Sequence, residues 1–145
     1  TVREGSVVVS ERFLGTGVDL VENERIEEMV QRWGAHFLDR VFSPDEQAYC
    51  QEKAVPSRHL AGRFAVKEAV SKAFRTGIGP RFGWLDLEVA RNSESGAPSV
   101  KLHGKAAEYA DQLGVTRVMI SLSHTRHHAV ASAVLLGVED GDDIS

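Results

Sequence analysis

The spacing of apolar residues changes several times along the chain, and each spacing predicts a different element. Residues 13–21 predict a buried strand, with apolar side chains at both ends and two glycines that let other groups approach the backbone. Residues 23–33 instead repeat apolar side chains at helical intervals, with Asn23 as a candidate N-cap and Gly34 as the stop. The core stripe predicted for this helix comprises Ile26, Met29, Val30 and Trp33.

The middle of the chain predicts two further helices, which a short apolar turn around residues 37–42 separates from the first. The sequence SPDE at 43–46 is a strong helix start, because its serine can be the N-cap and its glutamate can complete a capping box. A proline at position 56 then breaks this helix. A long helix follows, capped by Ser57 and ending near residue 75, and we expect it to be buried because apolar side chains cover most of its circumference.

The C-terminal half of the chain predicts mostly strands. The expected elements are strands at 84–89 and 99–103, a helix at 105–113, and strands at 117–123 and 129–136. Turn sequences between the paired strands indicate two hairpins. This order of elements favours an α+β fold with a mostly antiparallel sheet.

Length and composition indicate one soluble globular domain, since 145 residues with 42% hydrophobic content can bury a real core. We divide the chain into an N-terminal extension at 1–12, a domain at 13–137 and an acidic disordered tail at 138–145. The apolar segment 7–9 of the extension predicts either an extra edge strand or an arm. No apolar run is long enough to span a bilayer and no signal-peptide core is present, so we expect a cytoplasmic protein without a membrane partner.

Charge and cysteine content argue against several function classes. The formal net charge is −4, which argues against a nucleic-acid partner. Four acidic residues of the tail account for all of this charge, so the rest of the chain is neutral. The single cysteine, Cys50, excludes an intramolecular disulfide framework and a thiolate zinc site.

Three charged side chains stand in otherwise apolar elements. Asp19 lies between Val18 and Leu20, where an aspartate is either a hydrogen-bonded structural acid or a ligand in a metal or phosphate site. Glu68 and Lys72 share one line of the long helix, and their spacing alone favours an ordinary i,i+4 ion pair. Considered together, Asp19 and Glu68 could supply oxygen ligands for magnesium, while Lys72 could contact a phosphate of a nucleotide-like substrate.

The segment 121–124 offers a further candidate site, because it ends a strand with two serines on one face and His124 beside the turn. A Ser-His hydrolase is the weaker interpretation, since the chain has no GxSxG sequence. His124 and Arg63 could instead hold a second phosphate. Adjacent His127 and His128 cannot face the same way on a strand, so a paired zinc site is not expected.

Across residues 14–136 the chain resembles bacterial holo-[acyl-carrier-protein] synthases, the small single-domain type of 4'-phosphopantetheinyl transferase. The matching stretches are GTGVDLVE at 15–22 with Arg25-Ile26, FSPDE at 42–46, LAGRFAVKEA at 60–69 with Lys72-Ala73, GAP at 96–98 and SLSHT at 121–125. An aspartate motif followed by KEAxxK in this order is highly specific to that family.

The resemblance implies a homotrimer in which a mostly antiparallel sheet wraps around a long central helix, with active sites at the subunit interfaces. It implies transfer of 4'-phosphopantetheine from coenzyme A to a serine of apo acyl carrier protein in fatty acid biosynthesis, with release of adenosine 3',5'-bisphosphate. Asp19 and Glu68 would then bind Mg²⁺, and Glu68 would take the serine proton directly or through a metal-bound water. Lys72 would neutralise charge on the phosphoryl group.

The same resemblance implies roles for residues outside this centre. Arg63 and His124 would bind the nucleotide end of coenzyme A and its 3'-phosphate. Pro98 would pack near the adenine, and Thr125 would belong to the same binding set. Arg25 and Arg32 would dock the acidic carrier protein on the first helix, because a local basic patch can steer an acidic partner.

Two other functions fit the same residues: a metal-dependent hydrolase of a phosphoanhydride and a catalytically silent trimeric module that binds nucleotides. Like the transferase, both would have a magnesium-dependent nucleotide site. Only the transferase predicts a carrier protein made heavier by one phosphopantetheine group.

Overall fold

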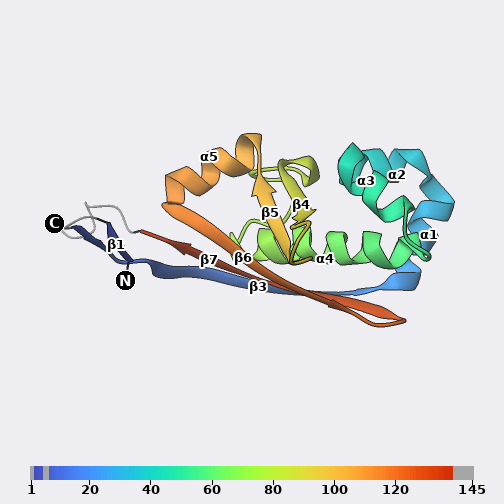
Figure 1. Cartoon of the computed structure of the whole chain (residues 1–145). Coiled ribbons are helices and arrows are strands. Elements are labelled where there is room, and N and C mark those ends of the chain that lie inside the picture. Colours follow the sequence, from blue (N-terminus) through green and yellow to red (C-terminus); the bar gives the residue numbers. More distant parts are fainter. Residues whose placement is uncertain (1, 5–6, 139–145) are drawn as a thin grey trace.

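The computed structural model describes residues 2–4 and 7–138, so the expected acidic tail lies outside the described residues from position 139 onward. The chain has the predicted α+β fold (Figure 1). In chain order the elements are β1 (Val2–Glu4), β2 (Val7–Val9), β3 (Arg12–Glu22), α1 (Asn23–Trp33), α2 (Ala35–Val41), α3 (Pro44–Gln51), α4 (Pro56–Ala73), η1 (Trp84–Asp86), β4 (Leu87–Arg91), β5 (Pro98–Leu102), α5 (Gly104–Leu113), β6 (Val115–His124) and β7 (His128–Gly137). In the described part of the chain, no helix is both long and apolar enough to cross a membrane.

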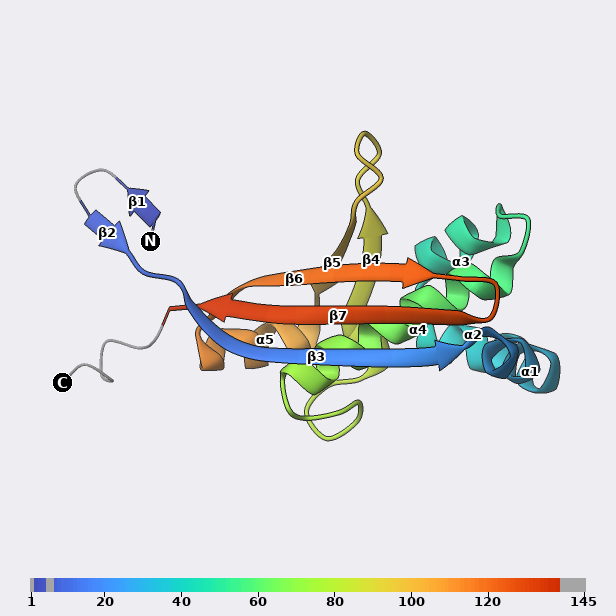
Figure 2. The same cartoon turned by 90° about the horizontal axis from the view of Figure 1, so that it is seen from below.

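The main sheet consists of β3, β7 and β6, in that order, and its neighbours are antiparallel. Figure 2 shows this sheet from the side opposite the helices. The predicted hairpins are confirmed, because β4 pairs with β5 and β6 pairs with β7. β1 and β2 form a separate two-stranded sheet beyond the end of the main one, so the N-terminal extension is a hairpin rather than an added edge strand.

Helix α4 lies along one face of the main sheet because the strands facing it carry very small side chains. Ala129, Ala131 and Ala133 of β7 are fully buried there. On β3, a Cβ atom at Gly15 or Gly17 would collide with a carbonyl oxygen of α4. The helix therefore contacts the backbone of β3 directly.

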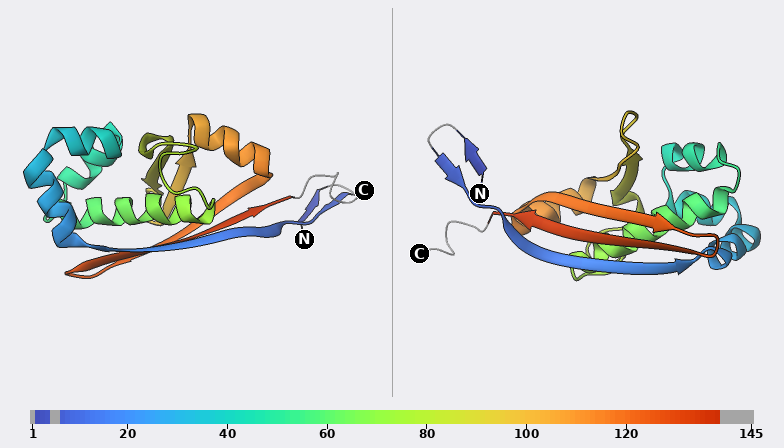
Figure 3. Two further views of the ribbon diagram at one scale, coloured as in Figure 1. Left: turned by 180° about the vertical axis from the view of Figure 1, so that it is seen from behind. Right: turned by 60° about the horizontal axis from the view of Figure 1, so that its bottom comes forward.

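The remaining elements cover α4 from the other side. Helices α1, α2 and α3 gather at one end of α4, while the β4–β5 hairpin and α5 cover the other end (Figure 3). The predicted start of α3 is confirmed: Ser43 Oγ accepts a hydrogen bond from Glu46 N at 3.1 Å, and Ser43 N donates to Glu46 Oε1 at 2.8 Å.

Two predicted helix caps are wrong. Asn23 lies inside α1, and its amide donates at 3.1 Å to the carbonyl oxygens of Thr125 and Arg126 in the β6–β7 turn. Helix α4 begins at Pro56, so Ser57 lies within its first turn, and no side chain caps this helix. At Asn23, a tertiary hydrogen bond has replaced the local one that the sequence favours.

Three further local predictions are also wrong. Residues 35–41 form the helix α2 rather than a turn, and residues 84–86 form a 3₁₀ turn before β4 rather than its first residues. Trp33 does not belong to the core, because its side chain is 53% exposed at the border of an open cleft.

Candidate active site

The contact between β3 and α4 brings Asp19 and Lys72 together. Lys72 Nζ lies 2.9 Å from Asp19 Oδ1 and also donates to the carbonyl oxygen of Val18 at 3.3 Å. The aspartate side chain is 14% exposed, whereas the lysine side chain is half exposed. A largely buried carboxylate therefore faces a cation that solvent can reach.

Glu68 lies one helical turn before Lys72 and is half-buried. Burial raises the pKa of the Glu68 carboxyl, and the charge of Asp19 raises it further, whereas Lys72 and Arg25 lower it. Within the described residues, no hydrogen-bond or salt-bridge partner holds this carboxylate. The pKa of the Glu68 carboxyl thus lies above the ordinary range of glutamate, which makes this carboxylate a stronger base than an exposed one.

The chemistry of Asp19 and Glu68 fits a magnesium ion. Their carboxylates repel one another, as the raised pKa of Glu68 shows, and a divalent cation would relieve this repulsion. In the part of the chain that the structure covers, no group of three or more His, Cys, Asp or Glu side chains could hold a metal. Magnesium commonly takes one or two protein carboxylates when substrate phosphates and water complete its coordination.

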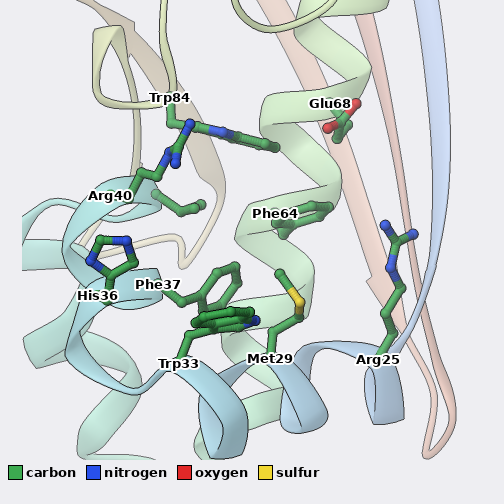
Figure 4. A pocket seen from close by; sticks show the side chains of 10 residues that line it. Arg25, Met29, Trp33, His36, Phe37, Arg40, Phe64, Glu68 and Trp84 are labelled. Carbon is green, nitrogen blue, oxygen red and sulfur yellow. The ribbon is translucent and has the colours of Figure 1, made fainter.

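A cleft of about 460 Å³ opens beside Glu68, between α1, α2, α4 and η1 (Figure 4). Its lining includes four Phe and Trp side chains, and the centres of the Phe64 and Trp84 rings lie 4.8 Å apart. Arg25 rises from α1 toward Glu68 at one rim. The lining residues are Arg25, Met29, Trp33, His36, Phe37, Arg40, Val41, Phe64, Glu68 and Trp84.

Arg32, the second arginine predicted on α1, is also exposed, and its guanidinium carbon lies 5.7 Å from the centre of the Trp33 ring. The two predicted docking arginines therefore lie near one cleft with an apolar floor.

A second group of functional candidates surrounds Arg63 on α4. Its side chain is only 3% exposed and its Nε atom has no hydrogen-bond partner among the described residues. The guanidinium carbon lies 4.1 Å from the centre of the Tyr49 ring, and Nη1 donates to the carbonyl oxygen of His59 at 3.5 Å. The His59 ring in turn meets the His124 ring edge to face at 5.3 Å.

This second group has a positive electrostatic character. Burial lowers the pKa of both His59 and His124, and the charged neighbours that shift them further are cations, with Arg91 and Arg63 acting on both. Lys53 Nζ and the Arg91 guanidinium carbon lie 4.4 and 5.9 Å from the centre of the Tyr49 ring. Cations gathered around a buried, unsatisfied arginine suit a phosphate group.

Pro98 and Thr125 lie at the edges of this second group. Pro98 is the first residue of β5 and pairs with Arg91 of β4. The Arg91 guanidinium donates a hydrogen bond to the carbonyl oxygen of Gly96. Arg91, Gly96 and Arg63 all line a cavity of about 660 Å³. The Thr125 hydroxyl accepts hydrogen bonds from the backbone N–H groups of residues 127 and 128, at 3.3 and 3.1 Å. In this structure the Thr125 side chain therefore holds the β6–β7 turn.

The predicted site residues thus form two groups on different faces of α4. Arg63 and Glu68 are five residues apart, which places them about 140° apart around the helix axis. Asp19, Glu68 and Lys72 lie with Arg25 on one side, and Arg63, His59 and His124 lie on the other.

Sequence reasoning assigned no role to Tyr49 or Arg91, whose positions in the second group depend on how α3 and β4 pack. It also missed Phe64 and Trp84, which line the cleft. An aromatic residue next to a candidate functional arginine, as Phe64 is to Arg63, is a signal that could have found one of them.

The model of the 4'-phosphopantetheinyl transferase superfamily matches residues 15–133. The holo-[acyl-carrier-protein] synthases of Koribacter versatilis and Syntrophus aciditrophicus are 48% and 44% identical to this chain, over 85% and 87% of it and 98% of each relative. The crystal structure of the Helicobacter pylori holo-[acyl-carrier-protein] synthase in complex with coenzyme A superposes with a TM-score of 0.73 at 36% identity, over 83% of this chain and 98% of that one.

Proposed function

The chain belongs to the holo-[acyl-carrier-protein] synthases of the 4'-phosphopantetheinyl transferase superfamily, and we propose that it moves the phosphopantetheine group of coenzyme A to a serine of an apo acyl carrier protein. Adenosine 3',5'-bisphosphate would be the second product and Mg²⁺ the cofactor. The observation that carries the proposal is the position of the half-buried Glu68 beside Asp19 and Lys72.

In this reaction the serine oxygen attacks the phosphorus that bears the pantetheine arm, and the bond from that phosphorus to the bridging oxygen of the pyrophosphate breaks. Glu68 would act as the general base and take the serine proton, directly or through a metal-bound water. Lys72 stabilises the negative charge that accumulates on the leaving phosphate, and its exposed ammonium can leave Asp19 to do so.

Asp19 and Glu68 would hold the magnesium ion together with the pyrophosphate oxygens. A bound magnesium ion supplies charge neutralisation at the pyrophosphate.

The group around Arg63 would bind the nucleotide end of the substrate. Arg63 and His124 would contact the 3'-phosphate, with Pro98 near the adenine and Thr125 at the adjacent turn. The unsatisfied Arg63 Nε atom and the surrounding cations support this assignment, because a phosphate supplies the missing acceptors.

One copy of the chain holds these two groups on different faces of α4, so a complete site would draw one group from each of two copies in a homotrimer. The sheet face that points away from α4 supports this assembly. It exposes Val18, Leu20, Met119 and Val130, with Leu20 directly opposite Val130 in the β3–β7 pair. Neighbouring exposed apolar side chains of this kind mark protein interfaces.

The cleft beside Glu68 would receive the carrier protein, with Arg25 and Arg32 facing its acidic surface. An apolar floor bordered by arginines matches a partner that presents apolar and acidic side chains together. A serine delivered there would lie next to the proposed base.

The test is to incubate the protein with apo carrier protein, coenzyme A and Mg²⁺ and to measure the intact mass of the carrier. We expect one phosphopantetheine adduct per carrier, and only when the metal is present. An unchanged carrier mass would refute the proposal. Adenosine bisphosphate released without carrier would then indicate a hydrolase, and binding of coenzyme A without turnover would indicate a silent module.

A further inference from the structure

Lys67 precedes Glu68 in α4 but points in a different direction, and its side chain is completely buried. Its ammonium donates to the carbonyl oxygen of Val41 at 2.6 Å, to Glu46 Oε1 at 2.8 Å and to the carbonyl oxygen of Trp84 at 3.3 Å. Three donors therefore meet three acceptors, which satisfies the hydrogen-bonding capacity of a lysine.

Glu46 extends this network. Its Oε1 also accepts from Ser43 N at 2.8 Å, within the capping box of α3, and its Oε2 accepts from Val89 N on β4 at 2.8 Å. Lys67 and Glu46 together connect α4 with the end of α2, the start of η1, the start of α3, and β4. Burial lowers the pKa of the Lys67 ammonium, and the adjacent Glu46 carboxylate opposes this shift.

Two of these contacts fall on the cleft beside Glu68. Val41 and Trp84 both line it, one from α2 and the other from η1. Lys67 thus donates hydrogen bonds to backbone carbonyl groups in two walls of the cleft. It lies on α4, the helix that also contributes Phe64 and Glu68 to the cleft.

We propose that Lys67 is a positioning residue that holds α2 and η1 at the separation the docking cleft requires. The proposal rests on the function proposed above, since it takes this cleft as the carrier site. Phe64, Val41 and Trp84 must keep a fixed separation if an apolar side chain of the carrier is to fit between them. A single ammonium bonded to both walls supplies that constraint.

Replacing Lys67 by methionine keeps the length of the side chain and removes all three donors. Two wall carbonyl groups and the Glu46 carboxylate then lack their partner, and they gain hydrogen bonds only by moving toward water. Because an unpaired buried carboxylate can unfold the protein, the double variant Glu46→Gln, Lys67→Met is the second test. It removes both charges and still leaves the wall carbonyl groups without their donor.

The experiment measures the KM for carrier, the KM for coenzyme A and kcat, with Leu135→Ala as a control. Leu135 is buried at the far end of the sheet, so its truncation lowers stability without touching the cleft. We expect Lys67→Met, or the double variant if the single one does not fold, to raise the carrier KM about tenfold while kcat and the coenzyme A KM stay within about twofold. We expect Leu135→Ala to change none of the three.

A second readout does not need activity, because the two tryptophans of the chain, Trp33 and Trp84, both line the cleft. In a Trp33→Phe background, acrylamide quenching of Trp84 fluorescence should increase when Lys67 is replaced. Unchanged quenching, or a loss of kcat without a change in carrier KM, would overturn the proposal. If the parent protein makes no adduct, the proposed function fails, while the quenching result still decides whether Lys67 holds the cleft walls.

Discussion

Gly17 of β3 touches the backbone of α4 at Ala69. A Cβ atom at position 17 would collide with the carbonyl oxygen of Ala69, would lie 2.7 Å from the Ala73 nitrogen and would press on Cβ of Lys72 at 3.0 Å. Asp19 follows two residues later on the same face of the strand, so the approach of β3 to α4 sets the distance between Asp19 and Lys72.

The substitution Gly17→Ala should therefore separate the strand from the helix. We expect a loss of about 1–3 kcal/mol in the free energy of unfolding, as is usual for overpacked cores. Turnover should fall about a hundredfold, because Asp19 would move away from Glu68 and Lys72, the groups with which it is proposed to act. Urea denaturation and the carrier mass assay measure the two effects. Gly83→Ala is the control and should change neither, since its Cβ would meet only Asp86 Oδ2 at 4.0 Å.

Arg75 lies two residues after the last residue of α4, in a left-handed backbone conformation that a residue with a Cβ atom disfavours. Its φ is +64°, the only positive φ of a non-glycine residue in the described part of the chain. Arg75 N donates to the carbonyl oxygen of Lys72, and Thr76 N donates to that of Ser71, which is the Schellman pattern that normally takes glycine. Arg75→Gly should raise the free energy of unfolding by about 1 kcal/mol. Arg75→Ala should leave the free energy of unfolding unchanged, since alanine keeps the Cβ atom. An equal increase in stability from both substitutions, measured by urea denaturation, would contradict this explanation.

Glu68 should make stability depend on pH in a defined direction. A carboxyl whose pKa is raised by folding binds its proton more tightly in the folded state, so it lowers stability as pH rises above the ordinary range of glutamate. In the absence of metal, the Glu68→Gln variant should therefore unfold at a higher temperature than the parent protein at pH 7. The difference between their unfolding temperatures should disappear near pH 4. The same variant should lose carrier modification. Glu108→Gln, on the exposed face of α5, should show neither effect.

Arg25→Ala tests the docking surface. Loss of its charge at the cleft rim should raise the carrier KM about tenfold at low salt, with little change in kcat. The difference should shrink as added salt screens the attraction. Lys105→Ala removes the same charge from α5, outside the cleft, and should leave the carrier KM unchanged. If Arg25→Ala left the KM for the carrier protein unchanged, the assignment of this cleft as the docking surface would be wrong.

Leu20→Asp tests the assembly. The leucine side chain is 66% exposed in one copy, so an aspartate there costs little in a monomer but would be buried without a partner in a trimer. Light scattering should report a smaller mass for this variant, and turnover should fall with it. Leu85→Asp, at an exposed position on η1, should keep the parent mass.

The parts of the fold that could be predicted are those that short-range signals determine. The Ser43 and Glu46 side chains are three residues apart, so their capping box can be recognised in the sequence. Hairpins are similarly local, and the two that were predicted are confirmed, although the β1–β2 hairpin was not predicted. Asn23 carries an equally strong local signal, but its amide bonds a turn about a hundred residues away, which no local pattern encodes.

The candidate site divides in the same way. Asp19 and Lys72 stand out in the sequence as charges among apolar residues, but their 2.9 Å contact depends on the two glycines of β3 and the crossing of α4. Lys67 shows the limit most clearly. It lies within a recognised motif, yet its partner Glu46 was assigned only to a helix cap, and the second role of Glu46 follows from the packing of α3 against α4 and β4.

The two faces of α4 have a genetic consequence. If each site combines the Glu68 face of one copy with the Arg63 face of another, a chain defective at Glu68 and a chain defective at Arg63 are each inactive alone. A mixed trimer contains one junction where both contributed faces are intact. Two loss-of-function alleles of this small gene would therefore complement each other in one cell, whereas two alleles that damage the same face would not.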